Sequence, residues 1–148
     1  MNRAFLSGTS LVALLALACA TSGQSGGMTP GPSGGMESLT KSLTGNLGVS
    51  PTQAVGGVGS MLSYAQGNLS PSQFQDITKA LPGAQSSMDA AKSLGATSGT
   101  ITDKAGLVSA FSKLGMNSDM LGKFVPIVSE TISKTGGADL GKLFSGLF

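Results

Sequence analysis

Few side chains in this sequence could carry out covalent chemistry. The 148 residues contain no histidine and one cysteine, Cys19. Ser-His and Cys-His pairs, and zinc sites built from histidine or several cysteines, therefore have no residues to form them. A Ser-Lys pair stays open because both residue types are plentiful, but no spacing marks one. We expect no enzymatic activity, no metal site and no cofactor.

The charged residues are scattered along the chain. The seven carboxylates have neither the close pairing of glycosidase acids nor the D-x-D spacing of a calcium loop; they are Glu37, Asp76, Asp89, Asp103, Asp119, Glu130 and Asp139. From Cys19 onward, eight lysines face these seven acids, a net charge of +1. No basic stripe is present, so we expect no nucleic-acid binding.

Cys19 is the residue with the clearest chemical prediction. Leu15-Ala16-Leu17-Ala18-Cys19 resembles the lipobox of bacterial lipoproteins, with Ala16 where leucine is preferred and Leu17 where a small residue is commoner. A lipobox cysteine becomes the first mature residue and carries a diacylglyceryl thioether, so we predict lipidation at Cys19. The alternative stays open that an ordinary signal peptidase cuts at Ala16-Leu17-Ala18 or Ala18-Cys19-Ala20 and the thiol has no role.

The first 35 residues read as an export signal followed by a tether. Residues 1–18 carry one positive charge, on Arg3, followed by an uncharged apolar run that is too short to span a bilayer. This pattern fits a signal peptide. The residue after Cys19 is Ala20 and not the aspartate that tends to retain lipoproteins at the inner membrane, so the outer membrane is the favoured location. Residues 19–35 are rich in Gly, Ser, Thr and Pro, the composition of a disordered tether. Its expected end-to-end distance is about 23 Å.

Residues 36–148 carry helical periodicity and no alternating strand pattern. We therefore predict an all-α domain, a small bundle of six or seven short helices after the tether. Ser-Pro-x-Gln cap signals begin two of these helices, at Ser50 and Ser70. The expected segments are, approximately, 37–46, 51–68, 70–81, 84–94, 102–114, 118–135 and 138–148.

Several side chains have predicted positions within these segments. Helix 51–68 should present one apolar stripe of Val55, Val58, Leu62, Ala65 and Leu69. Its glycines, Gly56, Gly57 and Gly59, should mark a close helix crossing, because each costs about 1 kcal/mol in a helix relative to alanine. Met88, Ala91 and Leu94 should form the apolar face of helix 84–94. Pro126 should kink or split the helix that contains it.

The last two helices suggest a contact surface for a partner or an apolar ligand. Its candidate residues are Met116, Met120, Phe124, Leu140, Leu143, Phe144 and Leu147. Gly136-Gly137 could let the last helix swing away from a methionine-lined groove. The default alternative is that the last helix simply closes the core.

Three stretches of the domain resemble a known family. They are LTGNLGVSPTQAVGGVGSMLSYAQGNLS, ITKALPGA and LVSAFSKLGMNSDMLGKFVPIVSETISKTGG. Over about residues 37–148 the chain is similar to the bacterial VcgC/VcgE-type proteins of unknown function. The resemblance implies a helical, exported protein but no activity. Many such proteins look like ordinary secreted ones, so it adds nothing to the prediction for Cys19.

Together these patterns predict an exported lipoprotein of the bacterial cell envelope. It would be anchored in the outer membrane through Cys19 and would face the periplasm. Its helical domain would be non-catalytic and act by contact with another envelope protein; the sequence leaves its oligomeric state open. The alternative function is that of a soluble periplasmic or secreted protein that binds an apolar ligand.

Overall fold

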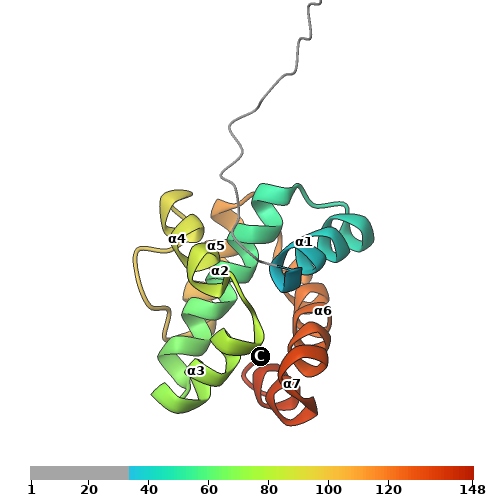
Figure 1. Cartoon of the computed structure of the whole chain (residues 1–148). Coiled ribbons are helices and arrows are strands. Elements are labelled where there is room, and N and C mark those ends of the chain that lie inside the picture. Colours follow the sequence, from blue (N-terminus) through green and yellow to red (C-terminus); the bar gives the residue numbers. More distant parts are fainter. Residues whose placement is uncertain (1–33) are drawn as a thin grey trace, which may run out of the picture.

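The computed structural model describes residues 34–148, which form seven α-helices and no strand (Figure 1). The helices are α1 Gly34–Leu47, α2 Pro51–Asn68, α3 Pro71–Ala80, α4 Ala84–Ser93, α5 Lys104–Lys113, α6 Ser118–Gly136 and α7 Ala138–Ser145. The predicted all-α fold is confirmed. Helix α1 begins at Gly34, so the last two residues assigned to the tether are helical. The predicted signal segment and residues 19–33 lie outside the described residues.

Helix α2 runs through the middle of the bundle, with α4 on one side and α1 and α6 on the other (Figure 1). The predicted stripe is fully buried at Val58, Leu62 and Ala65. Burial nevertheless extends around the whole helix from residue 56 to residue 65. The prediction of a single stripe was therefore too narrow, because neighbouring elements cover every side of this part of α2.

The glycines of α2 each receive a different neighbour. A Cβ on Gly59 would lie 1.9 Å from the carbonyl oxygen of Ser87 in α4. A Cβ on Gly57 would lie 2.7 Å from the Phe124 ring in α6. Such distances are shorter than van der Waals contact, so neither position has room for a side chain. The predicted close crossing is confirmed, and α4 and α6 are the helices that make it.

Helices α6 and α7 form a tight hairpin. Gly137 joins them with φ +103°, a conformation that favours glycine. A Cβ on Gly141 of α7 would lie 1.7 Å from Ser133 Oγ, so the two helices are in close contact. Helix α6 is continuous through Pro126, and the predicted split does not occur. Because Gly122 and Pro126 are both exposed, water can reach the carbonyl group that loses its helical donor.

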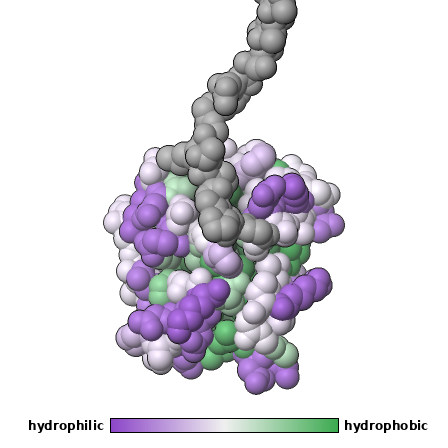
Figure 2. Space-filling model, viewed as in Figure 1, coloured by the Kyte–Doolittle hydropathy of each residue, from purple (hydrophilic) through white to green (hydrophobic). Residues whose placement is uncertain are grey.

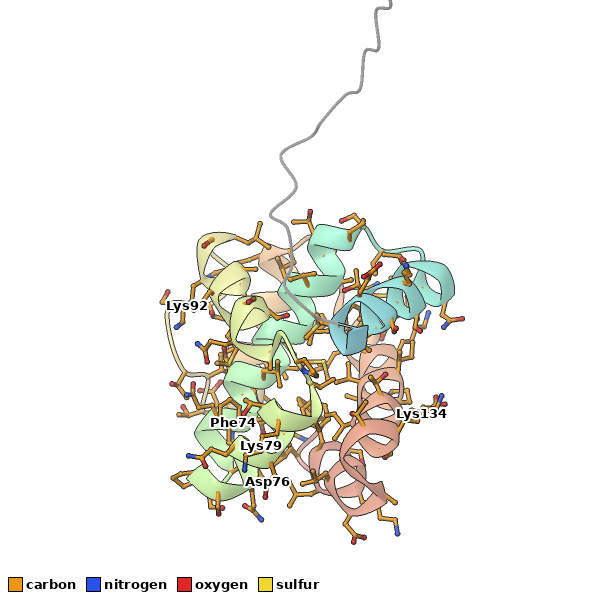
Figure 3. The ribbon with its side chains drawn as sticks, in the orientation of Figure 1. Phe74, Asp76, Lys79, Lys92 and Lys134 are labelled. Atoms are coloured by element: carbon orange, nitrogen blue, oxygen red, sulfur yellow. The ribbon has the colours of Figure 1, made fainter. Side chains whose placement is uncertain are left out.

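Surface charges lie in separate groups. Figure 2 shows purple side chains with paler and green surface between them on this face of the domain. Lys92 and Lys134, on opposite sides in Figure 3, each pair with an acid of their own helix. Such exposed pairs contribute little to stability. In residues 34–148, no helix is long and apolar enough to cross a membrane.

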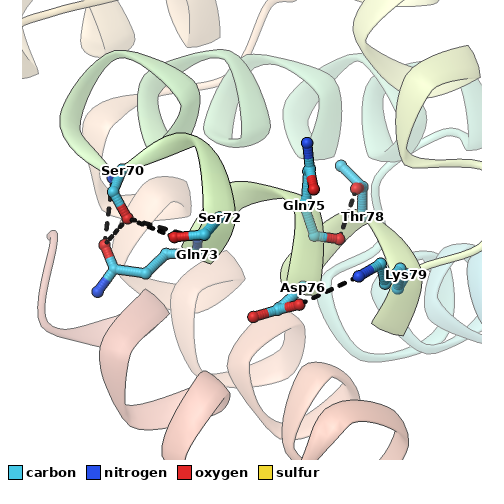
Figure 4. Close-up of polar contacts among 7 residues, drawn as sticks. All are labelled: Ser70, Ser72, Gln73, Gln75, Asp76, Thr78 and Lys79. Atoms are coloured by element: carbon cyan, nitrogen blue, oxygen red, sulfur yellow. Dashed lines mark hydrogen bonds and ion pairs between the residues drawn. The ribbon is translucent and has the colours of Figure 1, made fainter.

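The two predicted Ser-Pro-x-Gln caps are confirmed. Ser50 Oγ accepts from the Gln53 backbone N–H at 3.2 Å, and Gln53 Oε1 accepts from the Ser50 N–H at 3.0 Å. Ser70 and Gln73 make the same reciprocal pair at the start of α3 (Figure 4). A proline follows each serine, where its missing N–H removes no helical bond. These caps fix where α2 and α3 begin.

Candidate functional site

An open groove lies between the first turns of α2 and one flank of α4. Its volume is about 710 Å³. Its lining residues are Pro51, Thr52 and Val55 of α2, Ser86, Asp89, Ala90 and Ser93 of α4, and Leu94 directly after α4. Most of them are solvent-exposed, so the groove is a surface feature and not an internal cavity.

Leu94 is the most exposed large apolar side chain in residues 34–148, with 40% of its surface accessible. It belongs to the predicted apolar face of α4 with Met88 and Ala91, but those two residues are buried whereas Leu94 is exposed. Helix α4 ends at Ser93, and Gly95 with φ +69° turns the chain away, so Leu94 projects from the helix end. One Leu94 methyl rests above Gly56 of α2, while the rest of the side chain lines the groove.

The groove wall on α4 is made of small side chains. Ser86, Ala90 and Ser93 follow one another at i, i+4 and i+7, which places them along one side of the helix. Small residues let a further backbone approach closely. The groove therefore has a shallow floor, with Val55 and Leu94 as its large apolar contacts.

Asp89 is the one ionisable residue that lines the groove. Lys92 Nζ lies 3.8 Å from its Oδ1, and both side chains are about half exposed or more, so this pair is weak. At the start of α2, the Gln53 N–H bonds to Ser50 Oγ and Pro51 has no N–H, which leaves the Thr52 N–H as a donor. The groove thus presents negative charge and no cationic side chain.

The two helices that form the groove are held rigidly together. Gly59 and Ser87 bring the backbones of α2 and α4 into contact. The buried hydroxyls at this crossing bond within their own helices: Ser63 donates to the Gly59 carbonyl at 2.9 Å and Ser87 to the Gly83 carbonyl at 3.1 Å. No buried polar group is therefore left to disturb the contact, and the groove is preformed.

The structure places the first set of predicted contact residues mainly in the core. Met116 and Phe124 are 4% and 0% exposed, and both side chains pack over Gly57. The Phe124 ring also meets Phe111 edge to face, with centroids 5.3 Å apart. Met120 is partly buried against the same core. These residues form no open methionine-lined surface.

The second set lies at another level of the bundle. Phe144 is fully buried, whereas Leu140, Leu143 and Leu147 are partly buried. The Leu147 carbonyl accepts from the Tyr64 hydroxyl at 3.3 Å. Tyr64 is seven residues beyond Gly57, or about 10 Å along α2. Both sets nevertheless contribute to the same core. Cys19 lies outside the described residues.

Two smaller hollows are also present. One, of about 430 Å³, lies beside Asp76, Lys79 and Gly136, and the other, of about 420 Å³, lies along the loop from Ala96 to Asp103. In the second, the buried Thr97 hydroxyl has no hydrogen-bond partner among the described residues. Within the described residues, no group of three or more acidic, histidine or cysteine side chains could hold a metal ion.

Sequence reasoning missed the α2–α4 groove. One signal was available: Ala90 and Ser93 lie off the buried stripe of α4, opposite the cap that begins α2. The sequence does not show which side of α4 other helices leave uncovered, because that depends on the path of the loop after Leu94.

The fold and the groove define a small all-α domain with an open, apolar-walled surface groove. The chain belongs to the family of proteins of unknown function VcgC/VcgE, which it matches over residues 16–147. That match covers all seven helices of the domain, so the family resemblance predicted from its sequence is confirmed. No curated protein and no solved structure matches the chain.

Proposed function

We propose that the protein is an exported lipoprotein of the bacterial cell envelope whose helical domain binds another envelope protein in the α2–α4 groove. The anchor would be a lipid on Cys19, in the outer membrane and facing the periplasm. The domain would act by contact and not by catalysis. The residue content supports this role, because the chain lacks histidine and has no thiol beyond Cys19.

The observation that carries the proposal is the groove with its exposed Leu94. A large apolar side chain that is 40% exposed loses hydrophobic stabilisation, which a partner covering it would restore. The rigid Gly59–Ser87 contact keeps this surface formed without a ligand. A preformed surface lowers the ordering cost of binding.

The alternative function, a soluble protein that binds an apolar ligand, fits this groove less well. Small-molecule sites usually bury 70–90% or more of their ligand. Pro51, Thr52 and Ser86 line the groove and are themselves exposed, so an apolar molecule placed there would remain in contact with water. A protein partner brings its own surface and closes the groove.

The anchor is tested by feeding cells a labelled fatty acid and comparing the wild type with Cys19→Ala. We expect label and membrane association in the wild type only. Equal labelling of both proteins, or of neither, would contradict lipidation. The binding role is tested separately, by crosslinking from Ser93 in the groove within cells. If a crosslinker at Ser93 captures no other protein, the domain does not bind a partner in the groove.

A further inference from the structure

We infer that the groove takes a cationic amphipathic helix of an envelope protein, with its apolar side on Leu94 and Val55 and a basic side chain opposite Asp89. This inference rests on the proposed function, because it names the class of partner for the same groove. It commits to a protein helix as the occupant, and not to a lipid or a small molecule.

The charge of the groove selects a cationic partner. Asp89 is its one ionisable side chain, and its pairing with Lys92 is long and solvent-exposed. No lysine lines the groove. In the first turn of α2, the Gln53 N–H is occupied by its cap and Pro51 has no N–H, so Thr52 alone could donate to an anion there. A basic side chain would be attracted, whereas an anionic group would be repelled.

The shape of the groove selects a helix. The row Ser86, Ala90 and Ser93 has helical spacing and small side chains, so the ridge of another helix can lie against it at a normal packing distance of 8–10 Å. The described domain has no strand, so it has no sheet edge to which an extended peptide could add. The groove also has no aromatic side chain to hold a proline-rich segment. Binding of a helix in the groove is therefore the mode that fits it best.

The length of the groove sets the size of the contact. From Ser86 to Leu94 the wall spans eight residue steps, or about 12 Å, which corresponds to about two helical turns. A matching partner would carry apolar residues at i, i+3 or i+4, and i+7, with Lys or Arg beside them. Such a helix would cover both Val55 and Leu94.

The test uses the full chain and two synthetic peptides of about 16 residues: an amphipathic leucine–lysine helix, and the same sequence with glutamate for each lysine. Binding is measured by fluorescence anisotropy at low salt and located by amide shifts in the NMR spectrum. We expect the lysine peptide to bind at least tenfold more tightly than the glutamate peptide. The amide shifts should gather at Thr52, Val55, Ala90 and Leu94.

A matched pair of variants isolates the charge. Asp89→Lys should weaken binding of the lysine peptide at least tenfold. Asp76→Lys should change it less than twofold, because Asp76 also pairs with a lysine at i+3 but lies away from the groove, on α3. Asp89→Asn and Asp76→Asn give the same comparison if the charge reversals perturb folding. Equal effects of the two sites, shifts elsewhere, or equal binding of both peptides would overturn the inference.

Two further outcomes separate this inference from the proposed function. If the lysine peptide does not bind, but crosslinking from Ser93 in cells still captures an envelope protein, the helix inference is wrong and the proposed function stands. If vesicles of anionic phospholipid shift the groove amides in place of the peptide, the occupant is a lipid and the inference is also overturned. If nothing crosslinks from the groove, both fail.

Discussion

Gly59 of α2 lies directly against the backbone of Ser87 in α4, so close that a Cβ on Gly59 would be 1.9 Å from the Ser87 carbonyl oxygen. A flexible side chain could move aside, but a backbone carbonyl within a helix cannot. This contact fixes how α2 and α4 cross. It therefore fixes the groove that the same two helices form nearer the start of α2.

Replacing Gly59 by alanine should destabilise the domain strongly. Overpacking of this kind costs about 1–3 kcal/mol, and a backbone clash should reach the upper end of that range or exceed it. Gly122→Ala is the control: nothing lies within 4 Å of a Cβ at Gly122. It should raise stability by about 0.5–1 kcal/mol, because alanine favours the helix. Urea unfolding measures both variants, and equal effects would show that the crossing is looser than described.

Phe144→Ala tests whether α7 closes the core. Phe144 is fully buried, and its ring packs against Phe148 with centroids 5.1 Å apart. Truncating a buried phenylalanine costs about 3–5 kcal/mol, so we expect a large loss of stability in thermal or urea unfolding. Lys142→Ala, on the exposed side of α7, should have little effect. A Phe144→Ala protein that stays as stable as the wild type and gains binding of an apolar dye would favour a detachable α7.

Thr97→Val tests the hydroxyl in the loop after α4. Its Oγ1 is buried without a hydrogen-bond partner in residues 34–148, a state that destabilises the fold. Valine has nearly the same shape and no hydroxyl. We expect unchanged stability or a gain of about 1 kcal/mol. Thermal unfolding of the two proteins measures the difference. A loss of stability above about 1 kcal/mol would show that an internal water satisfies the hydroxyl.

The pH dependence of stability should be flat near neutrality and fall in acid. The pKa of the Glu37 carboxyl is lowered by its hydrogen bond and charge attraction to Lys41, and that of Glu130 is lowered in the same way by Lys134. A carboxyl whose pKa is lower in the folded state stabilises the fold above its unfolded pKa. That contribution disappears as the pH falls through the folded value.

Both carboxyls are exposed, so each contribution is small and weakened by salt. Residues 34–148 contain no histidine and no cysteine, and thus no side chain that ordinarily titrates between pH 5 and 8. Urea midpoints at pH 3, 4, 6 and 8 test this expectation. The double variant Glu37→Gln, Glu130→Gln should lose less stability in acid than the wild type. A change in the midpoint between pH 6 and 8 would contradict the expectation and indicate a strongly shifted group.

Local features of the fold were predictable from sequence. Ser50 and Gln53 are three residues apart, so their reciprocal cap is predictable from local sequence, whereas the bond from Gln53 Nε2 to the Leu114 carbonyl at 3.0 Å is not. The glycines of α2 predicted a close crossing because an interior helical glycine is otherwise unfavourable. Even so, the sequence could not identify Ser87 and Phe124 as the neighbours that meet them.

The candidate site was not predictable in the same way. Met116 and Phe124 could be core or contact residues, because methionine and phenylalanine suit both roles, and both are buried in the core. Leu94 continues the apolar spacing of Met88 and Ala91 in α4, yet it is exposed while those two residues are buried. Its exposure depends on the helix ending one residue earlier and on the loop after it. Such long-range placement is not encoded in local periodicity.

Site-specific photo-crosslinking from Ser93 in living cells tests the central claim most directly. A crosslinker at Ser93, which lines the groove, should give an adduct with one envelope protein, joined at a basic amphipathic helix. The same crosslinker at Ser112, an exposed position on α5, should not, and Asp89→Lys should abolish the Ser93 adduct. No adduct from Ser93, or equal adducts from Ser112 and from the Asp89→Lys protein, would contradict the account.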